Sequence, residues 1–168
     1  MRSDSKQKAW PVSLPELEQL VAGLQPTIKD AAICVLVLSA FWGCFRLGIV
    51  APSVSTNKDQ RYKMWPLMVN GNDVRERHNA SLELELHYSK TNQYKERLHL
   101  VRLYPIAGSV LCPVHAWKTL CALCQLAGLA ADVPLAQYGA GMEEMGTADA
   151  VKRVLKAQFL AWLGATGH

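Results

Sequence analysis

An uncharged stretch from Ala31 to Phe45, followed at once by Arg46, places the strongest constraint on how this chain folds. A helix that crosses a bilayer needs about 20 apolar residues, and Arg46 interrupts this stretch before that length is reached. A charge at the centre of such a helix costs roughly 2.5–3.5 kcal/mol. The stretch therefore predicts a helix buried on nearly all sides in a protein core. We expect this helix to begin after Thr27, with Asp30 in its first turn, and to end at about Arg46.

The composition is that of one globular domain. The chain has 168 residues, of which 50% are hydrophobic and 19% are charged, enough to bury a sizeable core. Its formal net charge of +4 is a mild basic excess, which permits nucleic acid as a partner but does not demand it.

The five cysteines are odd in number, and no apolar signal segment precedes them in the polar stretch from Met1 to Val12. Both features indicate reduced thiols in an intracellular protein. Cys121 and Cys124 have a metal-like spacing, but they fall in a helical pattern and no second pair accompanies them. Two small core residues one turn apart are the better interpretation, so we expect no metal and no cofactor. Residues 1–9 are expected to be disordered.

Three further helices are predicted from their end signals. Ser13-Leu-Pro-Glu16 is a capping box that begins a helix through about Ala22, with Gly23 as its stop. Pro113 suits a first helical position, and the following helix is expected to run over 114–126 and to close at Gly128. Thr147 caps a helix through about Leu163. Its apolar face comprises Val151, Val154, Leu155, Phe159 and Trp162, and its basic face comprises Lys152, Arg153 and Lys156.

Between these helices the pattern changes to a period of two. Residues 82–87 alternate strictly between apolar and polar, which predicts a strand with one buried face. Residues 98–103 predict a second strand, whose alternation slips at Leu100-Val101 and suggests a bulge. Met64 to Val69 is a candidate third strand, and residues 129–146 are expected to be irregular. The fold class is therefore α+β and mainly helical, with a small three-stranded antiparallel sheet.

Basic residues are concentrated around this sheet. Span 58–103 holds nine lysines and arginines against six acidic residues, which is half of the chain's 18 Lys and Arg. A basic loop of this kind can follow a phosphate backbone, although charge alone favours an ordinary solvated hairpin. Arg46 adds a guanidinium whose planar fork matches two phosphate oxygens. Taken alone, Arg46 is better explained as an arginine that snorkels to the surface or pairs with a carboxylate.

The order of the segments resembles the catalytic domain of tyrosine recombinases, the phage integrase-like DNA breaking-rejoining enzymes. A helix ending in Gly43-Cys-Phe-Arg46 is followed by strands with Ser89-Lys90-Thr91 between them. A Cys112-Pro-Val helix start and a final Thr166-Gly-His168 come next. The resemblance covers residues 10–168 and is nearer to members found in eukaryotic mobile elements. It implies the DNA breaking-rejoining catalytic core as the fold.

The resemblance also implies roles for individual residues. Arg46 matches the arginine that clamps the scissile phosphate. Lys90 matches the lysine that enters the minor groove and protonates the leaving 5′ oxygen, with Lys95 as an alternative on the same loop. His168 matches the first residue of the His-x-x-Arg box. Lys90, Lys95 and Arg97 would contact double-stranded DNA, on which the family assembles as oligomers, and a eukaryotic member would work in the nucleus.

Several departures from the family pattern accompany this resemblance. Ile49 stands where the family has an acidic residue, and no residue matches the second arginine of the box or the nucleophilic tyrosine. All five tyrosines precede His168. We therefore expect residues 1–168 to form a partial catalytic domain that lacks its C-terminal part and is inactive in strand cleavage. A non-catalytic DNA-binding or partner-binding relic of a mobile element is the alternative, and a membrane-associated protein based on residues 31–50 is a third.

Overall fold

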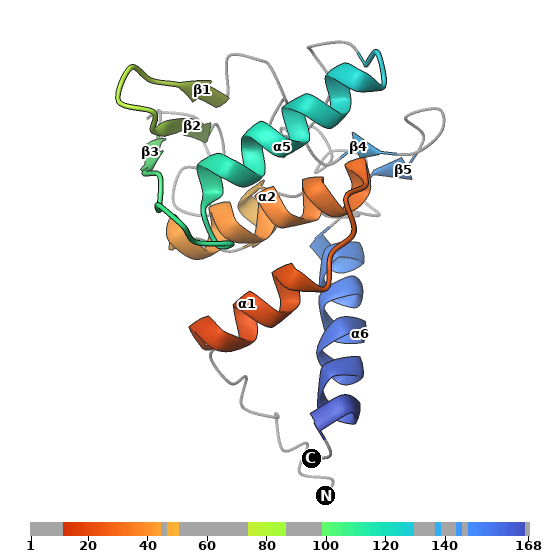
Figure 1. Ribbon diagram of the computed structural model, residues 1–168. Coiled ribbons are helices and arrows are strands. Elements are labelled where there is room, and N and C mark those ends of the chain that lie inside the picture. The colour runs from red at the N-terminus through yellow and green to blue at the C-terminus, as the bar shows by residue number, and fades with distance from the viewer. Residues whose placement is uncertain are drawn as a thin grey trace, which may run out of the picture.

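The computed structural model describes residues 12–44, 47–50, 74–86, 99–129, 137–138, 144–145 and 148–166. These residues form an α+β fold that is mainly helical, as predicted (Figure 1). The helices are α1 (Leu14–Ala22), α2 (Ile28–Trp42), the short α3 (Leu47–Val50), α5 (Pro113–Leu126) and α6 (Ala148–Thr166). The strands are β1 (Val74–Glu76), β2 (Leu82–Leu86), β3 (His99–Leu103), β4 (Gln137–Tyr138) and β5 (Glu144–Met145).

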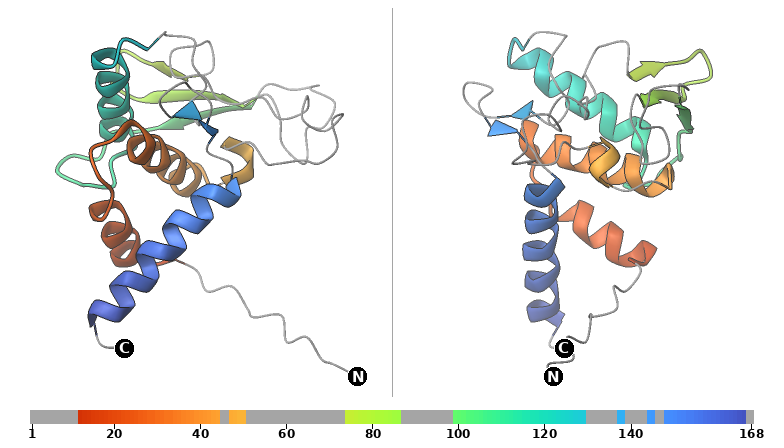
Figure 2. Two further views of the ribbon diagram at one scale, coloured as in Figure 1. Left: turned by 90° about the vertical axis from the view of Figure 1, so that its right-hand side faces the viewer. Right: turned by 180° about the vertical axis from the view of Figure 1, so that it is seen from behind.

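Helix α2 is the centre of the core. It lies between α5 on one side and α1 with α6 on the other, in every view (Figures 1 and 2). Ile33, Leu36 and Leu38 are fully buried, so the uncharged stretch is indeed a core helix. Among the described residues, no helix is both long enough and apolar enough to cross a membrane.

Local capping sets the helix starts, and the caps predicted at Ser13 and Thr27 are confirmed, whereas the cap predicted at Thr147 lies outside the described residues. The Ser13 backbone N–H donates to the Glu16 carboxylate at 2.7 Å, and the Ser13 hydroxyl accepts from the Glu16 N–H, which completes the capping box. The Thr27 hydroxyl accepts from the Asp30 N–H at 3.2 Å at the start of α2. Both caps satisfy amides that have no partner inside the first helical turn.

Helix α2 ends earlier than predicted, at Trp42 rather than near Arg46. Gly43 is its C-cap, and Cys44 adopts a left-handed conformation with φ of 54°, which an α-helix cannot continue. The Trp42 indole N–H donates to the Leu111 carbonyl at 2.9 Å. This bond ties the end of α2 to the segment that leads into α5.

Helix α5 begins at Pro113 and packs along α2. The Cys112 thiol sulfur accepts the backbone N–H groups of Ile106 at 3.3 Å and His115 at 3.4 Å, so Cys112 caps the helix and fixes the preceding loop. Gly128, with φ of +67°, follows the C-cap as predicted.

The cysteines of α5 belong to the core, as expected. Cys124 is buried, and Cys121 packs against the same cluster. Burial raises the pKa of the Cys121 thiol to about 11, which opposes its ionisation.

The sheet is an antiparallel meander in the order β1-β2-β3. Strands β2 and β3 pair one to one from Leu82–Leu103 to Leu86–His99, so the predicted bulge at Leu100-Val101 is wrong. Leu100 instead points to the outer face, where 52% of it is exposed. The third strand is β1, whereas the candidate strand over 64–69 lies outside the described residues.

Between Val151 and Lys156, helix α6 has the apolar and basic faces that its sequence predicts, whereas the side chains of Phe159 and Trp162 lie outside the described residues. Val151 is fully buried and Val154 is partly buried, whereas the three basic side chains Lys152, Arg153 and Lys156 are exposed. The Gln158 side-chain amide donates to the Gly23 carbonyl at 3.2 Å and so joins α6 to the end of α1. Span 129–146, expected to be irregular, contains the short ladder of β4 and β5.

Opposite faces of the sheet should respond differently to truncation. Leu84 is 2% exposed on the core face, so Leu84→Ala should lower the free energy of unfolding by about 2–5 kcal/mol. Leu100→Ala removes the same atoms from the outer face and should change stability by less than about 1 kcal/mol. Chemical denaturation followed by circular dichroism measures both values, and similar losses would contradict the assignment of the two faces.

Candidate nucleic-acid interface

The five residues predicted for the DNA site, Arg46, Lys90, Lys95, Arg97 and His168, lie outside the described residues. In the chain, Arg46 falls between α2 and α3, and His168 follows α6. Lys90, Lys95 and Arg97 belong to the connection between β2 and β3. The distances among their side chains therefore stay a prediction.

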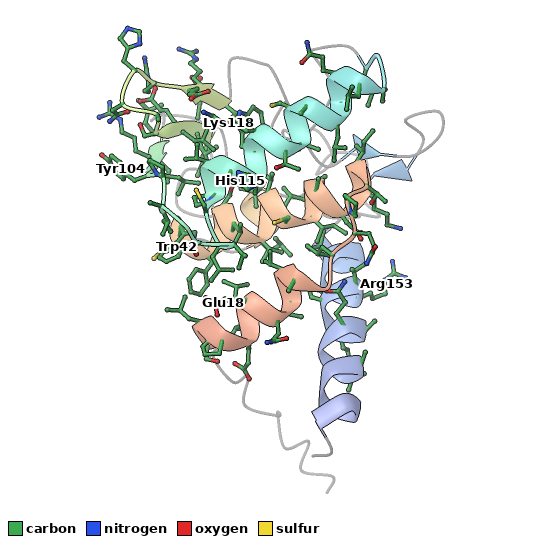
Figure 3. The ribbon with its side chains drawn as sticks, in the orientation of Figure 1. Glu18, Trp42, Tyr104, His115, Lys118 and Arg153 are labelled. Atoms are coloured by element: carbon green, nitrogen blue, oxygen red, sulfur yellow. The ribbon has the colours of Figure 1, made fainter. Side chains whose placement is uncertain are left out.

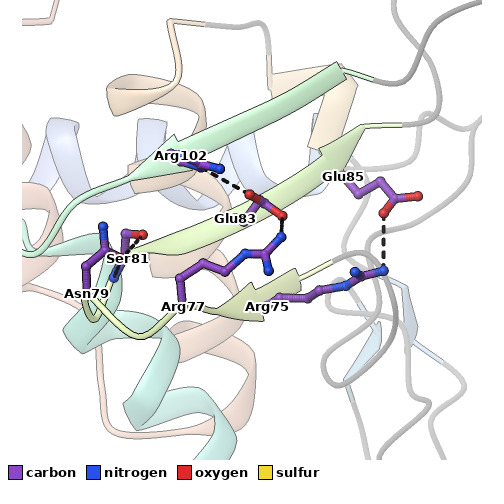
Figure 4. Close-up of polar contacts among 7 residues, drawn as sticks. All are labelled: Arg75, Arg77, Asn79, Ser81, Glu83, Glu85 and Arg102. Atoms are coloured by element: carbon purple, nitrogen blue, oxygen red, sulfur yellow. Dashed lines mark hydrogen bonds and ion pairs between the residues drawn. The ribbon is translucent and has the colours of Figure 1, made fainter.

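The described residues place a separate group of charged side chains on the outer face of the sheet (Figure 4). Successive residues of a strand point to opposite faces, and Leu82, Leu84 and Leu86 of β2 are buried on the core side. Glu83 and Glu85 therefore lie on the outer face, together with three arginines from the neighbouring strands and turn. The three are Arg75, Arg77 and Arg102.

Glu83 is the centre of this group. One carboxylate oxygen accepts from the Arg77 guanidinium, and the other accepts from the Arg102 Nε–H at 3.1 Å. Glu83 is only 3% exposed, whereas the Arg77 and Arg102 side chains are 47% and 57% exposed. The carboxylate is thus covered by two guanidiniums that themselves face solvent.

These contacts keep Glu83 ionised. The hydrogen bond from Arg77 lowers the pKa of the Glu83 carboxyl most; burial acts in the opposite direction, and the bond from Arg102 lowers the pKa further. The same pairing raises the pKa of the Arg77 guanidinium. The cluster is therefore a carboxylate with two cations, which leaves one positive charge in excess.

Two further ion pairs flank the cluster. Arg75 lies 3.4 Å from Glu85 on the same face, and Lys118 of α5 lies 2.9 Å from Glu76 of β1. Both pairs are largely exposed at their cationic ends, and exposed pairs of this kind contribute little to stability. The Lys118 contact links the edge of the sheet to α5 (Figure 3).

The turn between β1 and β2 borders the cluster. The Arg77 N–H donates to the Ser81 carbonyl at 2.9 Å, and the Ser81 hydroxyl donates to the Asn79 side-chain oxygen at 2.6 Å. Ala80 closes the turn in a left-handed conformation, with φ of 58°. Beside this turn lies an open hollow of about 450 Å³. Its lining comprises Glu76, Arg77, His78, Asn79, Ser81 and Arg102.

The outer face presents hydrogen-bond donors of the kind that oxyanions accept. Guanidiniums and amides donate hydrogen bonds to oxyanions, and in the described ranges no three His, Cys, Asp or Glu side chains converge to hold a metal ion. The exposed basic residues of α6, such as Arg153, lie on a different part of the surface (Figure 3). Sequence reasoning counted Arg77 and Arg102 among the basic residues but did not find their shared carboxylate, which depends on the strand register.

The role of Glu83 can be tested by neutralising it. Glu83→Gln should lower the free energy of unfolding more than Glu85→Gln does, because Glu83 joins two arginines and is buried. Its folded-state pKa lies below the ordinary 4.5, so its contribution is complete above that value and is lost as the pH falls through the lowered pKa. Denaturation curves of each variant and of the wild type are measured between about pH 7 and about pH 3. The difference in unfolding free energy between Glu83→Gln and the wild type should shrink as the pH falls. If the loss of stability in Glu83→Gln did not depend on pH, the ionised carboxylate would not be its cause.

The chain was also compared with known proteins. No protein-family model matches it, and neither does any curated protein or solved structure.

Proposed function

We propose that this chain is a duplex-DNA-binding domain of the tyrosine recombinase type, inactive in strand cleavage as residues 1–168, in which Arg46, Lys90 and His168 correspond to the residues that act at a scissile phosphate in that family. The observation that supports it best is the position of residues 87–98. They connect two neighbouring antiparallel strands, and the residues before and after them, Leu86 and His99, are paired. The segment that carries Lys90 therefore leaves and re-enters the sheet at one end.

A basic segment held at both ends by a sheet suits contact with a phosphate backbone. It carries Lys90, Lys95 and Arg97, and cations that neutralise phosphates supply most of the affinity of a protein for duplex DNA. The surrounding order of elements is consistent with this role. A helix ends shortly before Arg46, a three-stranded sheet follows, and Cys112-Pro113 opens the next helix.

The proposed chemistry is phosphoryl transfer. The Arg46 guanidinium would stabilise the negative charge that builds up on the non-bridging oxygens, since its fork donates two parallel hydrogen bonds. Lys90 would act as the general acid that protonates the leaving 5′ oxygen, and His168 would assist proton transfer. A tyrosine nucleophile would give a covalent 3′-phosphotyrosine that conserves the bond for rejoining.

A DNA-binding relic without catalysis is the second candidate, and Ile49 favours it. In the family that the chain resembles, an acidic residue stands at the position of Ile49 and orients the arginine. An isoleucine side chain accepts no hydrogen bond. Such a relic would need only the cations between β2 and β3.

Binding to duplex DNA is the common prediction of both candidates. Affinity should fall steeply between about 50 and 200 mM salt, and Lys90→Ala and Arg97→Ala should each reduce the slope of log K against log salt by about 1. Lys156→Ala on α6 is the control with the same charge change and should keep the wild-type slope. Fluorescence anisotropy with a labelled duplex measures these values. Affinity that is independent of salt would contradict both candidates.

Cleavage is tested separately with a nicked suicide duplex. The 168-residue polypeptide should bind this substrate without forming an adduct, because each of its tyrosines precedes the box matched at His168. Denaturing electrophoresis detects a covalent product as an SDS-stable, protease-sensitive shift of the DNA. Such a shift would show that one of the five tyrosines is a nucleophile, and a scan of Tyr→Phe variants would identify it.

A further inference from the structure

The outer face of the sheet carries an arginine pair that the proposed active site does not use. Arg77 and Arg102 approach the Glu83 carboxylate from opposite sides, one from the turn after β1 and one from β3 (Figure 4). Each donates to Glu83 through one nitrogen in these contacts. A guanidinium has five N–H donors, so most of the donors of this pair remain for another acceptor.

The shared carboxylate fixes how these donors are presented. A free arginine side chain samples many rotamers and loses that freedom on binding. Here the buried Glu83 holds both guanidiniums on one side of the sheet while about half of each side chain stays exposed. Two planar donor groups held in this way are preorganised for an oxyanion.

The charges around the hollow favour a single anionic group. Arg77, Arg102 and Lys118 oppose Glu76 and Glu83, which leaves an excess of one positive charge, and Lys118 is 2.9 Å from Glu76. His78 lines the same hollow, and its imidazole ring carries an N–H donor.

The neighbouring turn adds neutral donors. The Asn79 side-chain oxygen accepts both the hydroxyl and the backbone N–H of Ser81, at 2.6 and 3.2 Å. These two bonds fix the amide with its oxygen turned toward Ser81, so the NH2 end of Asn79 is the end offered to a ligand. The hollow thus combines two guanidiniums, an imidazole and an amide.

We propose that the pair of Arg77 and Arg102 binds a phosphate group. This inference rests on the proposed function for its source, a phosphodiester of duplex DNA. Glu83 acts as a positioning residue that orients both guanidiniums. The site is distinct from the connection that carries Lys90, because it lies toward the opposite end of β2.

Glu83, which holds the arginine pair, and the start of the β2–β3 connection lie on the same strand, a short distance apart. Glu83 and Leu86 are three residues apart on β2, which corresponds to roughly 10 Å at about 3.4 Å per residue. Successive phosphates of one strand advance by about 3.4 Å along the duplex axis. The point at which the β2–β3 connection leaves the sheet therefore lies within the span of a few phosphates from Glu83.

Three arginine variants with the same change of charge test this site. Arg77→Gln and Arg102→Gln should each weaken binding to a labelled duplex about tenfold at a fixed salt concentration. Arg75→Gln is the matched control, because Arg75 lies on the same face but does not line the hollow. It should weaken binding much less. Equal losses of DNA affinity in all three variants would mean that the arginines act only through their charge, and would overturn the proposal.

Glu83→Gln separates orientation from charge. It raises the net charge by one, so a surface that acts by charge alone would bind DNA more tightly. An oriented arginine pair would instead bind more weakly, and that is the expected result. Circular dichroism checks the fold of each variant, and the two arginine variants keep the test decisive if Glu83→Gln fails to fold.

A titration with inorganic phosphate shows whether the site binds free phosphate or only the phosphodiesters of DNA. It also separates the proposal for the arginine pair from the proposed function. The NMR signals of the Arg77 and Arg102 Nε–H groups should shift with phosphate, and those of Arg75 should not. Such shifts in a protein that binds no duplex would uphold a site for free phosphate while the proposed function fails. Duplex binding that Arg77→Gln and Arg102→Gln leave unchanged, without phosphate shifts, would overturn the arginine site and leave the proposed function standing.

Discussion

The packing of α2 against α5 is the interaction on which the rest of the structure depends. Side chains such as Ile33 and Leu36 are completely buried, and full burial of one such side chain contributes about 1.5–3 kcal/mol. The apolar sides of α5, α6 and the sheet belong to the same cluster. Because α2 is apolar on nearly all sides, the other elements must surround it, and their charged residues are left to the outer surface.

This constraint explains why the charged cluster forms where it does. The leucines of β2 belong to the same buried cluster as the apolar residues of α2 and α5, so the alternating glutamates lie on the other face of the sheet. Glu83 is on the central strand β2, which is flanked by β1 and β3, so its carboxylate does not lie at an edge of the sheet. Arg102 of β3 and Arg77 of the turn after β1 cover it, and both carboxylate oxygens are hydrogen-bonded, which offsets the cost of burying the charge.

The sequence was most informative where structure is determined locally. Ser13, Thr27 and Pro113 mark helix starts that depend only on the first turn, and all three were predicted. The end of α2 was misplaced because the left-handed conformation of Cys44 is one that few residues other than glycine adopt. β1 is only three residues long and carries no alternation long enough to detect. The bond between Glu83 and Arg102 joins residues far apart in sequence, and the register that creates it follows from packing rather than from composition.

The burial of Glu83 is better explained by what it does to the two arginines than by stability. A buried ion pair often gives no more stability than apolar side chains of the same volume, because removing the charges from water is costly. A valine or leucine at this position would fit the same alternating strand without that cost, but it would leave Arg77 and Arg102 free to move. The carboxylate therefore serves best as a fixed point for two exposed guanidiniums. In the proposed phosphate site, that arrangement would hold the anion in a defined place on the outer face of the sheet.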